Sequence, residues 1–94
     1  MDKDLFKEKA KSTIDDLFQK IDDLEQKKEK VSEDLKGTMN EKLERLKQQK
    51  KELQEKYNEL EKATSDSWGE VKDAFSKSAD IFKNTISSIS KNFQ

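Results

Sequence analysis

The sequence contains no cysteine and no histidine. No disulfide can form within the chain, and neither thiolate nor imidazole is available to bind a transition metal or to act as a base near neutral pH. The carboxylate doublets Asp15-Asp16 and Asp22-Asp23 lack the glycine-containing loop of a calcium site. We therefore predict no catalytic residue, no cofactor or metal site, no small-molecule substrate and no enzyme activity.

Proline is absent, and glycine occurs only at Gly37 and Gly69. Only 30% of the residues are hydrophobic and 44% are charged. A chain of this composition either stays disordered or forms long helices that bury a narrow stripe. Because its apolar residues are spaced regularly and few residues oppose helix, the sequence predicts an all-α fold in a single elongated domain over 1–94.

Neither positive nor negative charge dominates, since the chain has 20 basic and 21 acidic residues. This balance argues against a nucleic-acid partner, which calls for a clearly basic face. The segment MDKDLFKEKAK at the start also has no apolar run of the length found in signal peptides or membrane spans. Cytoplasmic residence is therefore the default expectation.

Apolar residues recur at alternating steps of three and four, the pattern of a coiled coil. Lysines interrupt this stripe at Lys28 and Lys50, where their methylene groups can lie along the apolar surface while the ammonium reaches water. The predicted apolar seam consists of Ile14, Leu17, Ile21, Leu24, Val31, Leu35, Leu43, Leu46, Leu53, Tyr57 and Leu60.

The phase of the stripe changes near Gly37, a residue suited to the left-handed conformation that often ends a helix. Thr38 and Glu41 fit a capping box that would start the next helix. The sequence therefore predicts an antiparallel hairpin with a helix over 3–36, a turn at Gly37 and Thr38, and a helix over 39–64. Reflection of the stripe about Gly37 places Phe6 opposite Trp68.

The segment 64–69 is a weak point for helix, and helical spacing resumes over 67–93. Ser67 and Glu70 could cap a third helix that folds back to give a three-helix bundle. Alternatively, the second helix continues, kinked or straight, and its end overhangs the hairpin. The narrow seam favours the continuous helix, because it offers little width to hold a third one.

The C-terminal segment is more aromatic than the rest and carries many serines. If its apolar face is unpaired, it forms an interaction surface for a protein partner or a second copy of the chain, giving a homo-oligomer. If it is paired, the same residues form the core of a closed bundle. The candidate interface residues are Trp68, Val71, Phe75, Phe82, Ile86, Ile89 and Phe93.

Two functions are compatible with such a segment. The first is a non-enzymatic coiled-coil protein that acts through protein–protein interaction or self-association. The second is peripheral binding to a membrane surface, because a Ser/Thr-rich polar face of little net charge is typical of helices that sense lipid packing.

The order of features in residues 57–75 also suggests a family. A charged coiled coil with regularly spaced leucines leads into Ala63-Thr-Ser-Asp-Ser-Trp68-Gly-Glu-Val71-Lys72 and then an amphipathic, Phe-bearing tail. This arrangement, over about the last 55 residues, resembles small bacterial coiled-coil proteins described as stress-response proteins. The resemblance implies a role under stress and brings no catalytic residues.

Replacement of both Lys28 and Lys50 by leucine should raise the midpoint of thermal unfolding, because each layer of the seam would then be apolar. Circular dichroism during heating measures this directly. A lower midpoint would show that these positions do not lie on the seam.

Overall fold

Three helices make up most of residues 3–92, the part of the chain that the computed structural model describes. They are α1 (Lys3–Lys28), α2 (Glu33–Lys62) and α3 (Trp68–Asn92). The described residues contain no strand. The all-α prediction is confirmed.

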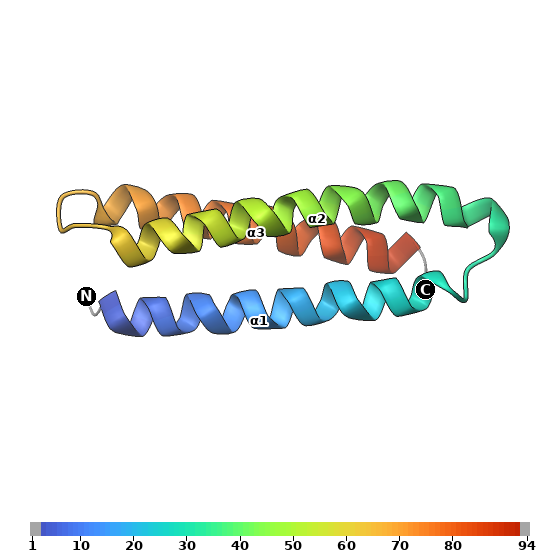
Figure 1. The fold of residues 1–94 in the computed structure, drawn as a ribbon, viewed down its shortest axis with the longest axis horizontal. Helices are drawn as coiled ribbons and strands as arrows, with labels where there is room; N and C mark the ends of the chain where they lie inside the picture. The colour runs from blue at the N-terminus through green and yellow to red at the C-terminus, as the bar shows by residue number, and fades with distance from the viewer. Residues whose placement is uncertain (1–2, 93–94) are drawn as a thin grey trace.

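The helices lie side by side in a bundle of 51 × 18 × 16 Å, with α2 antiparallel to both α1 and α3 (Figure 1). The segment 63–67 reverses the chain, so that α3 returns along α2 and also packs against α1. The weak point predicted at 64–69 therefore separates two helices. The continuous or overhanging second helix is wrong, and the folded-back alternative is the one observed.

The chain turns between α1 and α2 at residues 29–32, so the predicted turn at Gly37 and Thr38 is wrong. Gly37 lies inside α2 and does not have the positive φ of a left-handed helix terminator. The predicted helices 3–36 and 39–64 accordingly become 3–28 and 33–62. A single glycine costs a helix only about 1 kcal/mol relative to alanine, which packing elsewhere readily offsets.

Charges at the helix ends favour the observed turn. Lys27 and Lys28 occupy the last turn of α1, while Glu33 and Asp34 occupy the first turn of α2. Cations near a helix C-terminus and anions near an N-terminus each stabilise the end by about 0.3–1 kcal/mol. These charges are the sequence signal that indicates a turn at residues 29–32. Gly37 is a competing signal, and it led to the wrong prediction of the turn.

Blocks of opposite charge face each other along α1 and α2. Residues 15–25 of α1 contain five carboxylates and one lysine, whereas residues 42–51 of α2 contain five basic residues and one glutamate. The ion pair between Lys47 Nζ and Glu25 Oε1, at 3.6 Å, joins these blocks. At the opposite end, the lysine-rich start of α1 lies near the glutamate-rich end of α2. Residues of opposite charge therefore lie beside each other along this pair of helices.

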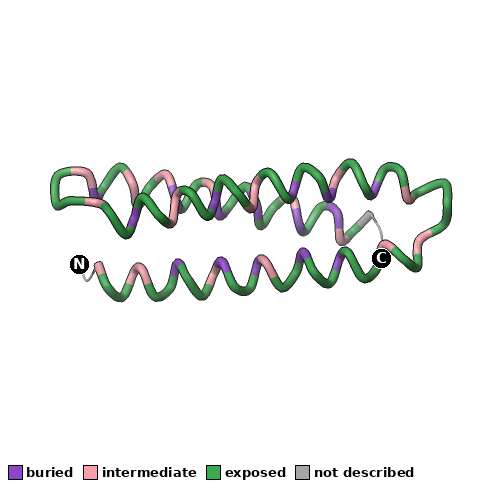
Figure 2. The backbone as a smooth tube through the Cα atoms, viewed as in Figure 1, coloured by how far each residue is buried: buried purple, intermediate pink, exposed green. Residues whose placement is uncertain are grey.

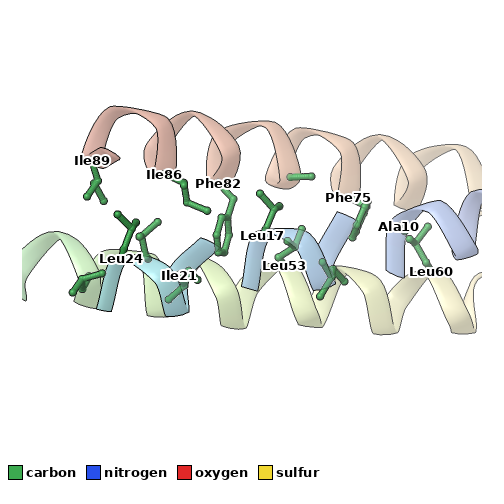
Figure 3. Packing of buried hydrophobic residues seen from close by; sticks show 14 of the residues in the cluster. Ala10, Leu17, Ile21, Leu24, Leu53, Leu60, Phe75, Phe82, Ile86 and Ile89 are labelled. Atoms are coloured by element: carbon green, nitrogen blue, oxygen red, sulfur yellow. The ribbon is translucent and has the colours of Figure 1, made fainter. Parts of the chain in front are cut away.

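Buried apolar residues from all three helices form one core along the length of the bundle (Figures 2 and 3). Eight residues of the predicted seam belong to it, whereas Val31 and Tyr57 are half-buried. Leu35 lies on the same stripe but is 43% exposed, so its predicted burial in the seam is wrong. The buried residues are Ala10, Ile14, Leu17, Ile21, Leu24, Met39, Leu43, Leu46, Leu53, Leu60, Trp68, Phe75, Ala79, Phe82, Ile86 and Ile89.

Both seam lysines are half-buried. The Lys50 ammonium lies 4.5 Å from the centre of the Phe18 ring, a geometry that stabilises by about 0.5–1 kcal/mol at exposed sites. Lys50 therefore lays its stem on apolar surface and directs its charge to an aromatic ring as well as to water.

The register of α1 against α2 can be read from pairs of contacting side chains. Glu25 and Lys47 have their sequence midpoint at residue 36, and Phe18 and Lys50 have theirs at residue 34. The reflection centre predicted at Gly37 is therefore displaced by only one to three residues. The predicted pairing of α1 with α2 is therefore close to the observed one, although the predicted position of the turn is wrong.

Replacement of Gly37 by alanine should increase the free energy of unfolding by about 0.5–1 kcal/mol, because the helical backbone would lose less entropy on folding. An added Cβ at Gly37 meets no atom within 4 Å, so no clash offsets the gain. Urea denaturation measures the change. A destabilised variant would instead support a left-handed turn at this residue.

Candidate interaction site

The predicted interface on α3 faces the interior of the bundle. Trp68, Phe75, Phe82, Ile86 and Ile89 are buried, and Val71 is half-buried against the same cluster. Figure 3 shows Phe82 and Ile86 directed towards α1 and α2. The closed-bundle alternative is therefore observed for these residues, and an exposed interface on them is wrong. Phe93 lies outside the described residues.

Aromatic rings gather where α1 begins and α3 begins. The Phe6 ring lies edge-to-face with Trp68 at 5.7 Å between centroids, and with Phe75 at 6.3 Å. Tyr57 of α2 joins them, 6.4 Å from Phe75. Such pairs add about 0.5–1.5 kcal/mol beyond the burial of their area. The predicted meeting of Phe6 and Trp68 occurs, although the chain reverses before Trp68 to produce it.

Two polar groups belong to this aromatic cluster. Burial, with smaller contributions from the Glu61 and Asp15 carboxylates, raises the pKa of the Tyr57 hydroxyl above its ordinary value. The Trp68 Nε1–H is buried without a hydrogen-bond partner among the described residues. An unpaired buried donor costs about 1–3 kcal/mol. Packing of the indole evidently outweighs this cost.

The 63–67 connection is held by short-range polar contacts. The Thr64 backbone N–H donates to Ser67 Oγ at 3.1 Å, and Lys3 Nζ donates to Ser65 Oγ at 3.3 Å. Ser67 immediately precedes α3. Its hydroxyl hydrogen-bonds back to Thr64, and its carbonyl accepts from the Val71 N–H at 3.1 Å. These polar contacts therefore stabilise the bend between α2 and α3.

Open grooves run along both sides of α3 in its C-terminal half. The groove between α1 and α3, of about 310 Å³, is lined partly by Lys20, Lys27 and Lys91. A second groove, of about 270 Å³, lies between α2 and α3 and includes Lys42 and Arg45. Most of the residues that line them are polar or charged, and neither groove encloses a buried cluster of reactive groups. We assign no small-molecule site to them.

The end of the bundle at the 29–32 turn exposes apolar surface. Three large apolar residues of the described chain are exposed: Leu5, Leu35 and Ile81, with exposed fractions of 48%, 43% and 58%. Leu35 differs from Ile81, because Leu35 follows half-buried Val31 and precedes fully buried Met39 on the same stripe. At this end of the bundle, the stripe of core residues on α2 therefore includes a solvent-exposed leucine.

The first turns of α2 extend past the end of α1, which accounts for the exposure of Leu35 (Figure 1). If α1 and α2 pair about residues 34–36, the final residue of α1, Lys28, lies opposite the region of Lys42. Residues 33–38 of α2 consequently have no segment of α1 beside them. This overhanging start of α2 is the candidate interaction site.

Within the described residues, no group of three or more acidic side chains is arranged to hold a metal ion. No helix there has the length and apolar character needed to cross a bilayer.

Comparisons with protein families, curated proteins and solved structures found no match to this chain.

Phe82 is fully buried at the centre of the α3 face and contacts Phe18, with 6.5 Å between ring centroids. Its replacement by alanine should lower the free energy of unfolding by about 3–5 kcal/mol, because it removes a large core side chain and leaves a cavity. Alanine at the neighbouring, exposed Ile81 should change it by less than about 0.5 kcal/mol. Equal effects in chemical denaturation would contradict the burial of this α3 face.

Proposed function

We propose that this chain is a non-enzymatic helical-bundle protein that acts through protein–protein association, with a second copy of itself as the partner. The exposed Leu35 on the overhanging start of α2 supports this proposal. Its stripe is that of the core, so a second apolar stripe of the same spacing fits it.

Self-association is favoured over binding of an unrelated partner, because the large apolar residues of α3 are already buried within the bundle. Trp68, Phe75 and Phe82 are buried in the bundle, so the aromatic surface first expected to recruit a partner is occupied. Apolar surface remains at the end of the bundle that carries the 29–32 turn. There the apolar stripe of α2 can pair with the same stripe of a second, antiparallel copy. A role under stress and cytoplasmic residence are part of the proposal only through the family resemblance and the composition.

Lipid binding through α3 is the weaker candidate. Apart from the exposed Ile81, the large apolar residues described in α3 pack against α1 and α2, so a membrane could contact them only after the bundle opens. Opening would expose the whole core and forfeit most of the stability of so small a domain. Failure to float with small neutral liposomes would eliminate this function.

Replacement of Leu35 by lysine should abolish self-association, because it places a charge where two apolar stripes meet. Light scattering over a concentration series should show the wild-type mass rising to that of a dimer, while the variant keeps the mass of one chain. Lysine at Ile81, which is more exposed but isolated from the core stripe, is the matched control and should dimerise normally.

A wild-type chain that remains monomeric throughout the series would overturn the proposed function. Dimerisation that is lost equally in both variants would show that the Leu35 site has no special role.

A further inference from the structure

The 29–32 connection lacks the residues that normally force a turn. Glu29, Lys30, Val31 and Ser32 include no glycine or proline, and none adopts positive φ. Hydrogen bonds of the i to i−3 type cross its start, from the N–H groups of Lys30 and Val31 to the carbonyls of Lys27 and Lys28. The Ser32 side chain makes no capping hydrogen bond to α2. These four residues could equally continue a helix.

The apolar stripe also continues through this connection. Six steps lead from Leu24 to Leu46, a separation of 22 residues, by way of Lys28, Val31, Leu35, Met39 and Leu43. The mean step is therefore about 3.67 residues, the value that keeps apolar residues on one face of a nearly straight helix. If α1 and α2 were joined into one helix, Leu35 would lie on the same stripe as the core.

The register locates the symmetry axis of an exchanged dimer. In the closed chain, α1 pairs with α2 about a midpoint at residues 34–36. Two continuous antiparallel helices that keep this register would have their twofold axis at Leu35. Leu35 would then meet Leu35 of the second copy, and Val31 would meet Met39 of the second copy.

Resting on the proposed function, we infer that the dimer is formed by exchange of α1 between two copies. In each copy α1 and α2 join into one helix through residues 29–32, and α1 packs against α2 and α3 of the second copy. The exchange keeps every contact between α1 and the other helices and changes only which chain supplies α1. It adds the Leu35 contact at the axis, and Asp34 lies beside Lys36 of the second copy.

The charge blocks support this arrangement. The acidic block at 15–25 and the basic block at 42–51 face each other in the closed chain. They remain opposed when α1 comes from the second copy, because the register is unchanged. Association therefore replaces intramolecular charge pairs by identical intermolecular ones.

Proline at position 33 separates the closed chain from the exchanged dimer. Glu33 is the first residue of α2, where proline is tolerated, and Ser32 has φ −65° and ψ 157°, the conformation favoured before proline. In a continuous helix the same proline would clash with the carbonyl of Glu29 and remove a hydrogen bond. Glu33→Pro should therefore keep the helical content of the bundle and reduce the dimer fraction at least tenfold.

Glu33→Ala is the matched control, because it makes the same change of charge and permits either conformation. It should dimerise at least as strongly as the wild type. Small-angle scattering supplies a second readout, since the joined helix over 3–62 is about 90 Å long at 1.5 Å per residue, against 51 Å for the closed bundle.

Cross-linking identifies which chain supplies α1. The chain has no cysteine, so Glu25→Cys and Lys47→Cys can be made separately, mixed in denaturant, refolded together and treated with a short bis-maleimide. Exchange should give a covalent dimer containing one chain of each kind. Glu25→Cys mixed with Asn58→Cys is the control and should give little product, because position 58 lies about 16 Å further along α2.

The outcomes are distinct. A wild-type dimer with no mixed cross-link and with unchanged assembly of Glu33→Pro would overturn exchange and leave self-association standing. A wild-type chain that stays monomeric would overturn both. A mixed cross-link together with loss of the dimer in Glu33→Pro supports exchange.

Discussion

Burial of the apolar face of α3 against the seam between α1 and α2 is the contact on which the rest of the structure depends. The first two helices present only narrow stripes interrupted by Lys28 and Lys50. Phe75 and Phe82 supply the large side chains that widen this seam into a core. Because α3 must reach both helices, the chain has to reverse after α2. Phe75 and Phe82 are consequently part of the core and are not displayed to a partner.

Electrostatics makes a modest contribution to the packing of α1 against α2. The ion pair between Lys47 and Glu25 is solvent-exposed, and exposed pairs stabilise a protein by at most about 1 kcal/mol each. The pair between Lys47 and Glu25 joins the basic block of α2 to the acidic block of α1 in the observed register. The charge blocks and the apolar stripe specify the same register, and this agreement is typical of sequences that define one arrangement.

The same register of α1 against α2 is compatible with the closed chain and with the exchanged dimer that we propose. The closed and exchanged forms contain the same contacts between α1, α2 and α3, so their packing energies largely cancel. What differs is the conformation of residues 29–32, the exposure of Leu35 and the entropy lost when two chains associate. Protein concentration and the local helix preference of the connection would therefore govern the balance between the closed chain and the proposed exchanged dimer, as in domain-swapped proteins.

Four features of the fold could be predicted from the sequence: the helical class, the seam from Ile14 to Leu24 and from Leu43 to Leu60, the weak point before Trp68 and the approximate pairing of α1 with α2. These features follow from periodicity and composition, which act locally along each helix. The position of the first turn could not be obtained in this way, because Gly37 and the charges around Ser32 are both weak local signals of similar size. Only tertiary packing decided between them. It also decided that α3 folds back, because Phe75 and Phe82 are buried only when α1 and α2 are already side by side in the folded chain.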